Sequence, residues 1–222
     1  QRQMCIRDRP KEVQIPSMEY PEEVDNTKLY FVDFPDAKQS VINIGYLGMS
    51  REDPDYYPAT VMNYKLGGSF SGNVNLVLRE EKGYTYGART YFSGSEIRGP
   101  FTASSSVRTN ATYESVKIFK EEMEKYREGI SEEDLEFTKN SLIKSNARAM
   151  ETLWSKMSLL TTMSTYGWDV TYKKDEEDII RNMTLEQHKE LAQKYIHPDK
   201  MIYVVSGDAA TQFNELKKAN FD

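Results

Sequence analysis

Residues 66–92 read LGGSFSGNVNLVLREEKGYTYGARTYF and contain the strongest structural signals in the chain. A helix is expected to end at Gly67-Gly68, because glycine favours the backbone conformations at which helices stop. The segment 71–82 has the spacing of a second helix, which Gly83 ends. Residues 84–92 are rich in aromatic and polar residues that suit a strand. The stretch is therefore expected to contain the end of one helix, a whole second helix and the beginning of a strand.

An arginine and a tyrosine in this stretch can project toward one cleft. Arg79 lies at the end of the predicted second helix, and Tyr86 lies just inside the strand. Arg provides a charged fork of donors and Tyr an oriented hydroxyl, so the pair suits holding a peptide carbonyl. The plainer interpretations are a cation favoured by the helix dipole and a half-buried strand aromatic. Tyr84 shares the strand face of Tyr86 by alternation, and Tyr86 is preferred for its spacing from Arg79.

The remaining sequence predicts an α+β fold. Strands cluster early and helices follow, which indicates a mainly antiparallel sheet covered on one face by helices. The first two strands read as a hairpin around the turn 35–37, and the last strand is apolar enough for the middle of a sheet. The expected strands are 29–34, 40–47, 84–92, 101–109 and 201–206. The expected helices are 55–66, 71–82, 113–126, one from 131, 154–166, one from 184, and 209–219.

The chain is expected to contain one domain at residues 28–222, preceded by a leader and linker at residues 1–27. Residues 1–9 (QRQMCIRDR) have no apolar period, and we interpret them as a non-native remnant. The prolines and acidic residues that follow read as an extended linker.

Composition excludes several classes of protein. The chain has 29 Lys and Arg against 35 Asp and Glu, a net charge of −6, which argues against a nucleic-acid partner. No apolar run approaches the roughly 20 residues of a membrane span. Cys5 is the only cysteine, so an intrachain disulfide and a thiolate zinc site are excluded. The bacterial periplasm or cell envelope and the cytoplasm both stay open as compartments.

The quoted stretch resembles the signature of the insulinase/pitrilysin-type zinc metallopeptidases. In that family an L-G-G turn is followed by L-R-E-x-x-G-x-x-Y, and here Leu66-Gly67-Gly68 is followed by LREEKGYTY at 78–86. The later segment 204–208 (VVSGD) is similar to the closing strand of the family. The similarity runs from about residue 28 to the C-terminus.

The resemblance implies a sheet of up to six strands, in a fold used twice per working unit. One half carries an H-x-x-E-H zinc motif, which this sequence lacks, and its two histidines are nine positions apart. The implied role is therefore the metal-free half, with no catalytic residue and no metal ligand of its own. Arg79 and Tyr86 would bind substrate and support the transition state. Gly67, Gly68 and Gly83 would shape the motif.

We therefore expect the non-catalytic half of a zinc metallopeptidase, inactive alone. Its partner would be a homologous zinc-bearing domain, on the same longer chain or in a heterodimer, and the two would enclose an unfolded peptide. The alternative is a structural or assembly subunit of the same fold without proteolytic activity. A third interpretation is a free-standing peptide-binding module that uses an exposed strand edge.

Other conspicuous residues have plain structural interpretations. His188 has helical spacing with apolar neighbours and is expected to be packed in the protein, and His197 precedes a proline at a turn. The methionines at 157 and 163 are expected to fill the core. Ser131 with Asp134, and Thr184 with Gln187, are typical of helix N-terminal caps.

Overall fold

A computed structural model describes residues 19–148 and 150–219. Its five-stranded sheet has the order β1-β5-β2-β4-β3. Only β1 and β5 run parallel, so the predicted α+β class with a mainly antiparallel sheet is confirmed. The predicted remnant at 1–9 lies outside the described residues, and the domain boundary near residue 28 stays a prediction. The strands are β1 (Lys28–Asp33), β2 (Gln39–Leu47), β3 (Thr85–Phe92), β4 (Pro100–Arg108) and β5 (Ile202–Gly207).

The hairpin expected from the first two strands is wrong. β5 lies between them, parallel to β1 and antiparallel to β2, with Tyr203 opposite both Leu29 and Ile44. Tyr203 and Val205 are fully buried, which confirms the central place predicted for this strand. A central strand buries its side chains among neighbours on either side, and this long-range gain outweighs the local turn signal.

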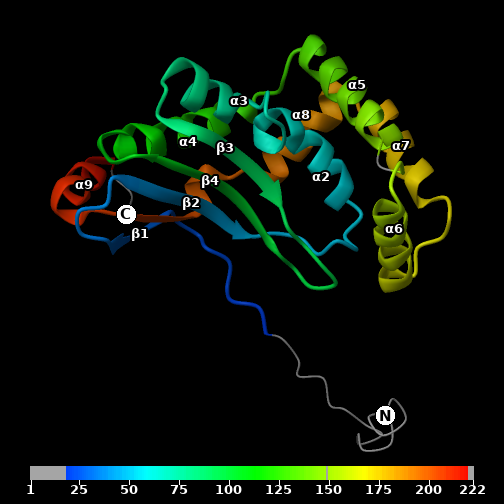
Figure 1. The fold of residues 1–222 in the computed structure, drawn as a ribbon, viewed down its shortest axis with the longest axis horizontal. Helices are drawn as coiled ribbons and strands as arrows, with labels where there is room; N and C mark the ends of the chain where they lie inside the picture. Colours follow the sequence, from blue (N-terminus) through cyan, green and yellow to red (C-terminus); the bar gives the residue numbers. More distant parts are fainter. Residues whose placement is uncertain (1–18, 149, 220–222) are drawn as a thin grey trace, which may run out of the picture.

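The helices gather on one face of the sheet, and the opposite face carries no helical layer (Figure 1). The α-helices are α2 (Tyr56–Asn63), α3 (Asn73–Asn75), α4 (Thr112–Tyr126), α5 (Glu132–Arg148), α6 (Leu153–Tyr166), α7 (Tyr172–Asn182), α8 (Leu185–Tyr195) and α9 (Ala209–Leu216). Short 3₁₀ turns are η3 (Thr109–Ala111), η4 (Pro198–Lys200) and η5 (Lys217–Ala219). Within the described residues, no helix is both long and apolar enough to cross a bilayer.

The core lies between the sheet and α4. Ile42, Ile44 and Phe101 point from the sheet into it, while Phe119 and Met123 enter from the helix. All five are fully buried. The apolar stripe predicted for this helix is therefore confirmed, and alternation along β2 and β4 leaves their other face to solvent.

Two π-helical segments fall within or overlap the quoted motif. Tyr64–Gly68 (η1) continues α2, and Leu76–Glu81 (η2) continues α3. The predicted helices are present, but Gly67-Gly68 lies inside the last turn of the first helix instead of following it. π-helical segments frequently occur at functional sites.

Both predicted N-terminal caps are confirmed. The backbone N of Asp134 donates to Ser131 Oγ over 3.1 Å, and Ser131 Oγ donates to the Asp134 carboxylate over 2.9 Å. Thr184 and Gln187 form a complete capping box.

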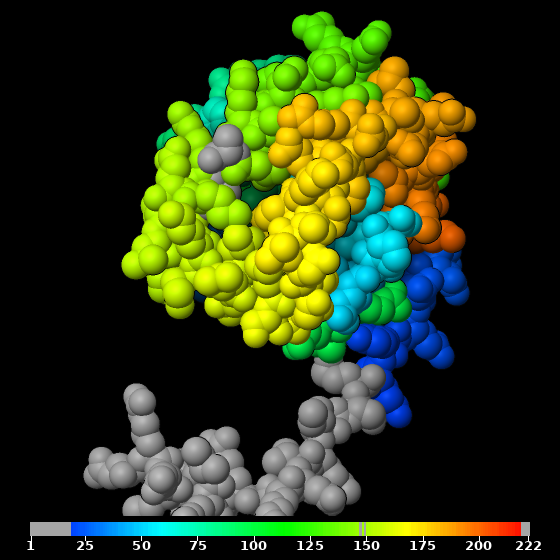
Figure 2. All heavy atoms as spheres, turned by 90° about the vertical axis from the view of Figure 1, so that its right-hand side faces the viewer, coloured from blue at the N-terminus to red at the C-terminus, as the bar shows by residue number. Residues whose placement is uncertain are grey.

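The prediction that Met157 and Met163 fill the core is wrong. No side chain of α6 is buried, and Leu153, Trp154 and Leu160 are among its exposed apolar residues. Figure 2 shows α6, in lime, at the margin of this side next to α7 in yellow. Helical spacing identifies an apolar stripe, but only the tertiary structure decides whether anything covers it.

Candidate functional site

The junction between α2 and η1 is fastened to the edge strand β3. Asn63 Nδ2 donates to the Thr90 carbonyl over 2.8 Å, and Thr90 Oγ1 donates to Asn63 Oδ1 over 2.6 Å. Both residues are buried. A Cβ at Gly67 would lie 2.7 Å from the Thr90 backbone nitrogen, and one at Gly68 would lie 3.1 Å from the Asn63 carbonyl oxygen. Gly67 therefore allows a close approach of helix and strand, and Gly68 avoids a clash with Asn63 of the preceding helical turn.

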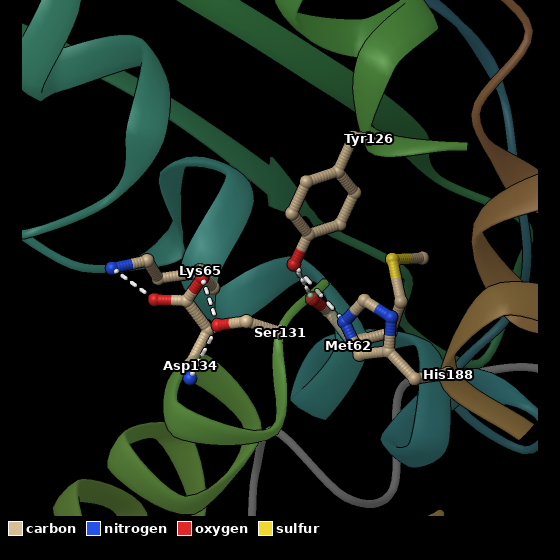
Figure 3. A network of polar contacts seen from close by, with 6 residues as sticks. All are labelled: Met62, Lys65, Tyr126, Ser131, Asp134 and His188. Carbon is tan, nitrogen blue, oxygen red and sulfur yellow. Dashed lines mark hydrogen bonds and ion pairs between the residues drawn. The ribbon is translucent and has the colours of Figure 1, made fainter. Parts of the chain in front are cut away.

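A partly buried network of polar contacts holds the same segment from the other side (Figure 3). Tyr126 Oη donates to the Met62 carbonyl over 2.6 Å and lies 3.1 Å from His188 Nε2. Lys65 Nζ lies 2.9 Å from the capping carboxylate of Asp134. Because these residues come from α2, α4, α5, η1 and α8, the network ties the motif to the rest of the helical layer.

His188 is packed in the protein, as predicted, with no exposed surface. Since the Tyr126 proton is directed to Met62, the Nε2 of His188 carries the proton and donates to Tyr126 Oη. Its Nδ1 is buried without a hydrogen-bond partner. Burial lowers the pKa of His188 to about 4, against opposing contributions from the Met62 carbonyl and Asp134.

Asn75 connects the loop after η1 to β3. Its Nδ2 donates to the Phe70 carbonyl over 2.7 Å, and its Oδ1 accepts from the Ala88 backbone N over 2.9 Å. Asn75 is buried, whereas the Phe70 ring is 68% exposed. This contact places an exposed aromatic ring beside the strand that carries Tyr86.

Arg79 lies in the last turn of η2, where Gly83 ends the segment. Gly83 has φ +62°, a left-handed conformation, and its N donates to the Arg79 carbonyl over 3.1 Å. The Arg79 guanidinium stacks on Phe70, with 4.4 Å from Cζ to the ring centroid. Its Nε lies 3.4 Å from Glu80 Oε1. The aromatic face fixes the guanidinium and leaves N–H groups at its edge for a ligand.

Tyr86 lies in an irregularity of β3, where the register with β4 shifts between Thr85 and Ala88. The Gly87 backbone N donates to Thr85 Oγ1 over 3.0 Å, and Ser105 Oγ donates to the Gly87 carbonyl over 2.9 Å. These bonds clamp the chain on both sides of the bulge. The Tyr86 side chain is 90% exposed, which fits the way bulges re-aim side chains.

Tyr84, which directly precedes β3, and Tyr86 within the strand occupy different environments. Tyr84 packs against the core cluster, and the Arg108 guanidinium lies over its ring at 5.6 Å. Tyr86 instead borders an open groove over β2, β3 and β4. Of these two tyrosines, Tyr86 lines the groove and Tyr84 does not.

The groove contains residues that reasoning from sequence missed. Its lining includes Phe70, Asn75 and Arg89, together with Gly67, Gly68 and Tyr86 of the predicted set. Arg79 does not line the groove and meets it through the Phe70 ring. A large aromatic residue within the small-residue run GGSFSG was a signal for Phe70.

The described residues do not fit a zinc ion. Among them, no three His, Cys, Asp or Glu side chains gather closely enough to hold a metal. His188 is bonded to Tyr126, and His197 Nε2 lies 2.8 Å from the Lys194 carbonyl at a turn. No step of any reaction is therefore assigned to a metal on this part of the chain.

Comparisons with known proteins agree with this fold. A crystal structure of a peptidase M16 inactive domain from Pseudomonas fluorescens is 27% identical, has a TM-score of 0.79, and aligns with 90% of this chain and 48% of its own. A protease structure from Helicobacter pylori is 15% identical, with a TM-score of 0.76, over 90% of this chain and 48% of that one. It shows the same fold.

A curated relative is similar over a shorter range. The uncharacterized zinc protease YmxG of Bacillus subtilis is 28% identical over 124 residues, which are 55% of this chain and 30% of that protein. This chain thus spans less than half the length of these matched proteins. The family model described as the peptidase M16 inactive domain matches residues 6–142, more than half of the chain. The resemblance seen in residues 66–92 is confirmed, and the chain belongs to the peptidase M16 inactive domain family.

Proposed function

We propose that this chain is the metal-free half of a zinc peptidase. It pairs with a homologous zinc-bearing domain, and the two halves enclose an unfolded peptide. The observation that carries this proposal is the placement of Tyr86, which a clamped bulge holds almost fully exposed at the groove. The membership of the inactive-domain family and the relative named a zinc protease support it.

Within this proposal, the residues of this chain bind and polarise substrate. The Tyr86 hydroxyl donates to the carbonyl oxygen on which negative charge develops, and Arg79, supported by Phe70, holds a neighbouring carbonyl. The partner supplies zinc and the groups that activate water.

The test is hydrolysis of an unstructured peptide by this chain with its zinc-bearing partner. The chain alone should be inert, and the pair should show chelator-sensitive cleavage. Tyr86→Phe should lower turnover roughly ten- to thousand-fold, as the loss of an oxyanion donor does. Tyr84→Phe is the matched control and should retain turnover, because Tyr84 packs against the core. Unchanged turnover in Tyr86→Phe would refute the assignment.

A second candidate is a structural or assembly subunit of the same fold. The uncovered apolar side chains of α6, including Trp154 and Leu160, favour it because such surfaces mark protein contacts. A stable pair that binds zinc and never cleaves peptide would support this candidate.

A module that adds a peptide strand at the β3 edge is disfavoured. The Ala88 nitrogen is already bonded to Asn75, and the Thr90 carbonyl is bonded to Asn63. Tyr56 Oη donates to the Phe92 carbonyl over 3.2 Å. Strand addition needs free backbone groups at the edge, and these three are occupied.

A further inference from the structure

The groove beside Tyr86 differs in charge from the rest of the protein. The chain has six more acidic than basic residues. Among the described residues that line the groove, however, Arg89 is the single charged side chain, and none is Asp or Glu. The floor is polar and uncharged at Asn43, Ser104 and Ser106. An acidic protein thus presents a locally positive surface here.

The arginines around this surface stack on aromatic rings. The Arg89 guanidinium lies 5.5 Å from the Tyr91 ring centroid, and that of Arg108 lies 5.6 Å from the Tyr84 centroid. Arg108 is opposite Gln39, which lines the groove. Within the part of the chain that the structure describes, neither arginine forms a salt bridge, and Arg79 forms one with the exposed Glu80. Stacking leaves the N–H edge of a guanidinium available for a carboxylate.

The position of Arg89 directs it to this face of the sheet. Its neighbours Ala88 and Thr90 are buried toward the helices, so alternation turns Arg89 to the open face. It pairs across the strands with Ser104, which also lines the groove. Tyr86 and Arg89 both line the groove, so a ligand that extends from Tyr86 along β3 meets this charge.

We propose that this groove selects acidic side chains of an extended peptide and that Arg89 determines this specificity. The inference deepens the proposed function and rests on it. Asn43, Ser104 and Ser106 can bond peptide N–H and C=O groups, and the rings of Phe70 and Tyr86 offer apolar contact. An aspartate or glutamate side chain near the scissile bond would form an ion pair with the Arg89 guanidinium. No carboxylate among the described residues that line the groove would repel it.

The test is fluorescence anisotropy of this chain with two unstructured peptides of equal length. One carries Asp and Glu, and the other carries Lys at the same positions. The acidic peptide should bind about tenfold more tightly, with affinity that falls as salt rises. Arg89→Met keeps the apolar stem, removes the charge and should abolish most of this preference. Arg181→Met is the matched control, since Arg181 lies on α7 outside the groove and pairs with Glu177. Equal binding of both peptides, or equal effects of the two variants, would overturn the proposal.

Cleavage of the same peptides by the assembled pair separates this inference from the proposed function. Cleavage with equal kcat/KM for the acidic and basic peptides would refute the acidic subsite and leave the half-enzyme proposal standing. Selective binding of the acidic peptide without cleavage by any zinc-loaded pair would refute the half-enzyme proposal instead. Tyr86→Phe should retain the acidic preference in binding, because it keeps Arg89 in place.

Discussion

Gly67 lies so close to Thr90 that a Cβ at position 67 would stand 2.7 Å from both the backbone nitrogen and the Oγ1 of Thr90. A strand backbone cannot move aside as a flexible side chain can, so η1 and β3 would separate. We expect Gly67→Ala to lower the free energy of unfolding by about 1–3 kcal/mol, the usual range for overpacking. Urea denaturation of the native protein and the variant measures this difference in the free energy of unfolding. Gly87→Ala is the control, since its Cβ would meet only Asn75 Oδ1 at 3.9 Å. Equal losses in the two variants would contradict the steric explanation.

Asn63 supplies two buried hydrogen bonds to Thr90. Asn63→Ala leaves the Thr90 carbonyl and hydroxyl without these partners, so we expect a loss of about 2–3 kcal/mol. Thr90→Val should be less harmful in the Asn63→Ala background than in the native chain. Chemical denaturation of the two single variants and the double variant measures that coupling, expected at about 1 kcal/mol. Strict additivity would show that the two side chains do not stabilise each other.

Phe70 is expected to matter for activity more than for stability. Its ring is exposed but supports the Arg79 guanidinium at 4.4 Å. Phe70→Ala should lower kcat/KM of the assembled peptidase by about tenfold. The reason is that the substitution removes the cation–π contact that positions the Arg79 guanidinium. Its melting temperature should hardly change. Phe34→Ala is the matched control because Phe34 is similarly exposed and lies outside the groove. A large fall in melting temperature for Phe70→Ala would indicate a structural role.

His188 should make the fold sensitive to acid. In the folded protein its pKa is about 4, against 6.5 for the free side chain. Between pH 6.5 and pH 4, His188 is therefore mostly protonated in the unfolded chain and mostly neutral in the folded chain. The free energy of unfolding consequently decreases as the pH falls from 6.5 to 4. The loss in the free energy of unfolding should reach about 3 kcal/mol, because each unit by which folding lowers the pKa of His188 corresponds to about 1.36 kcal/mol.

Urea midpoints at neutral pH and near pH 4.5 test this expectation. His188→Gln should be less stable at neutral pH, because packing is lost, yet its stability should depend less on pH. The same substitution at His197, which lies at a turn, should leave the native pH dependence intact. A native slope in His188→Gln would assign the acid sensitivity to other groups.

The local features of the fold were predictable because they depend on residues close in sequence. The apolar stripe of α4 repeats every three or four residues, and the caps at Ser131 and Thr184 act within one helical turn. The motif at 66–92 marked the family and placed Arg79 and Tyr86 near one another in the chain. Signals of this kind need no knowledge of distant partners.

The sequence by itself thus determined the helix and strand content, the family and the absence of an H-x-x-E-H motif. Only the tertiary structure decided that β5 separates β1 from β2, that α6 is uncovered, and that Phe70 lies under Arg79 while Arg89 lines the groove. The physical reason is that helix caps and amphipathic periods are short-range. Strand order, burial and the stacking of an arginine on a ring are instead set by which distant surfaces pack together.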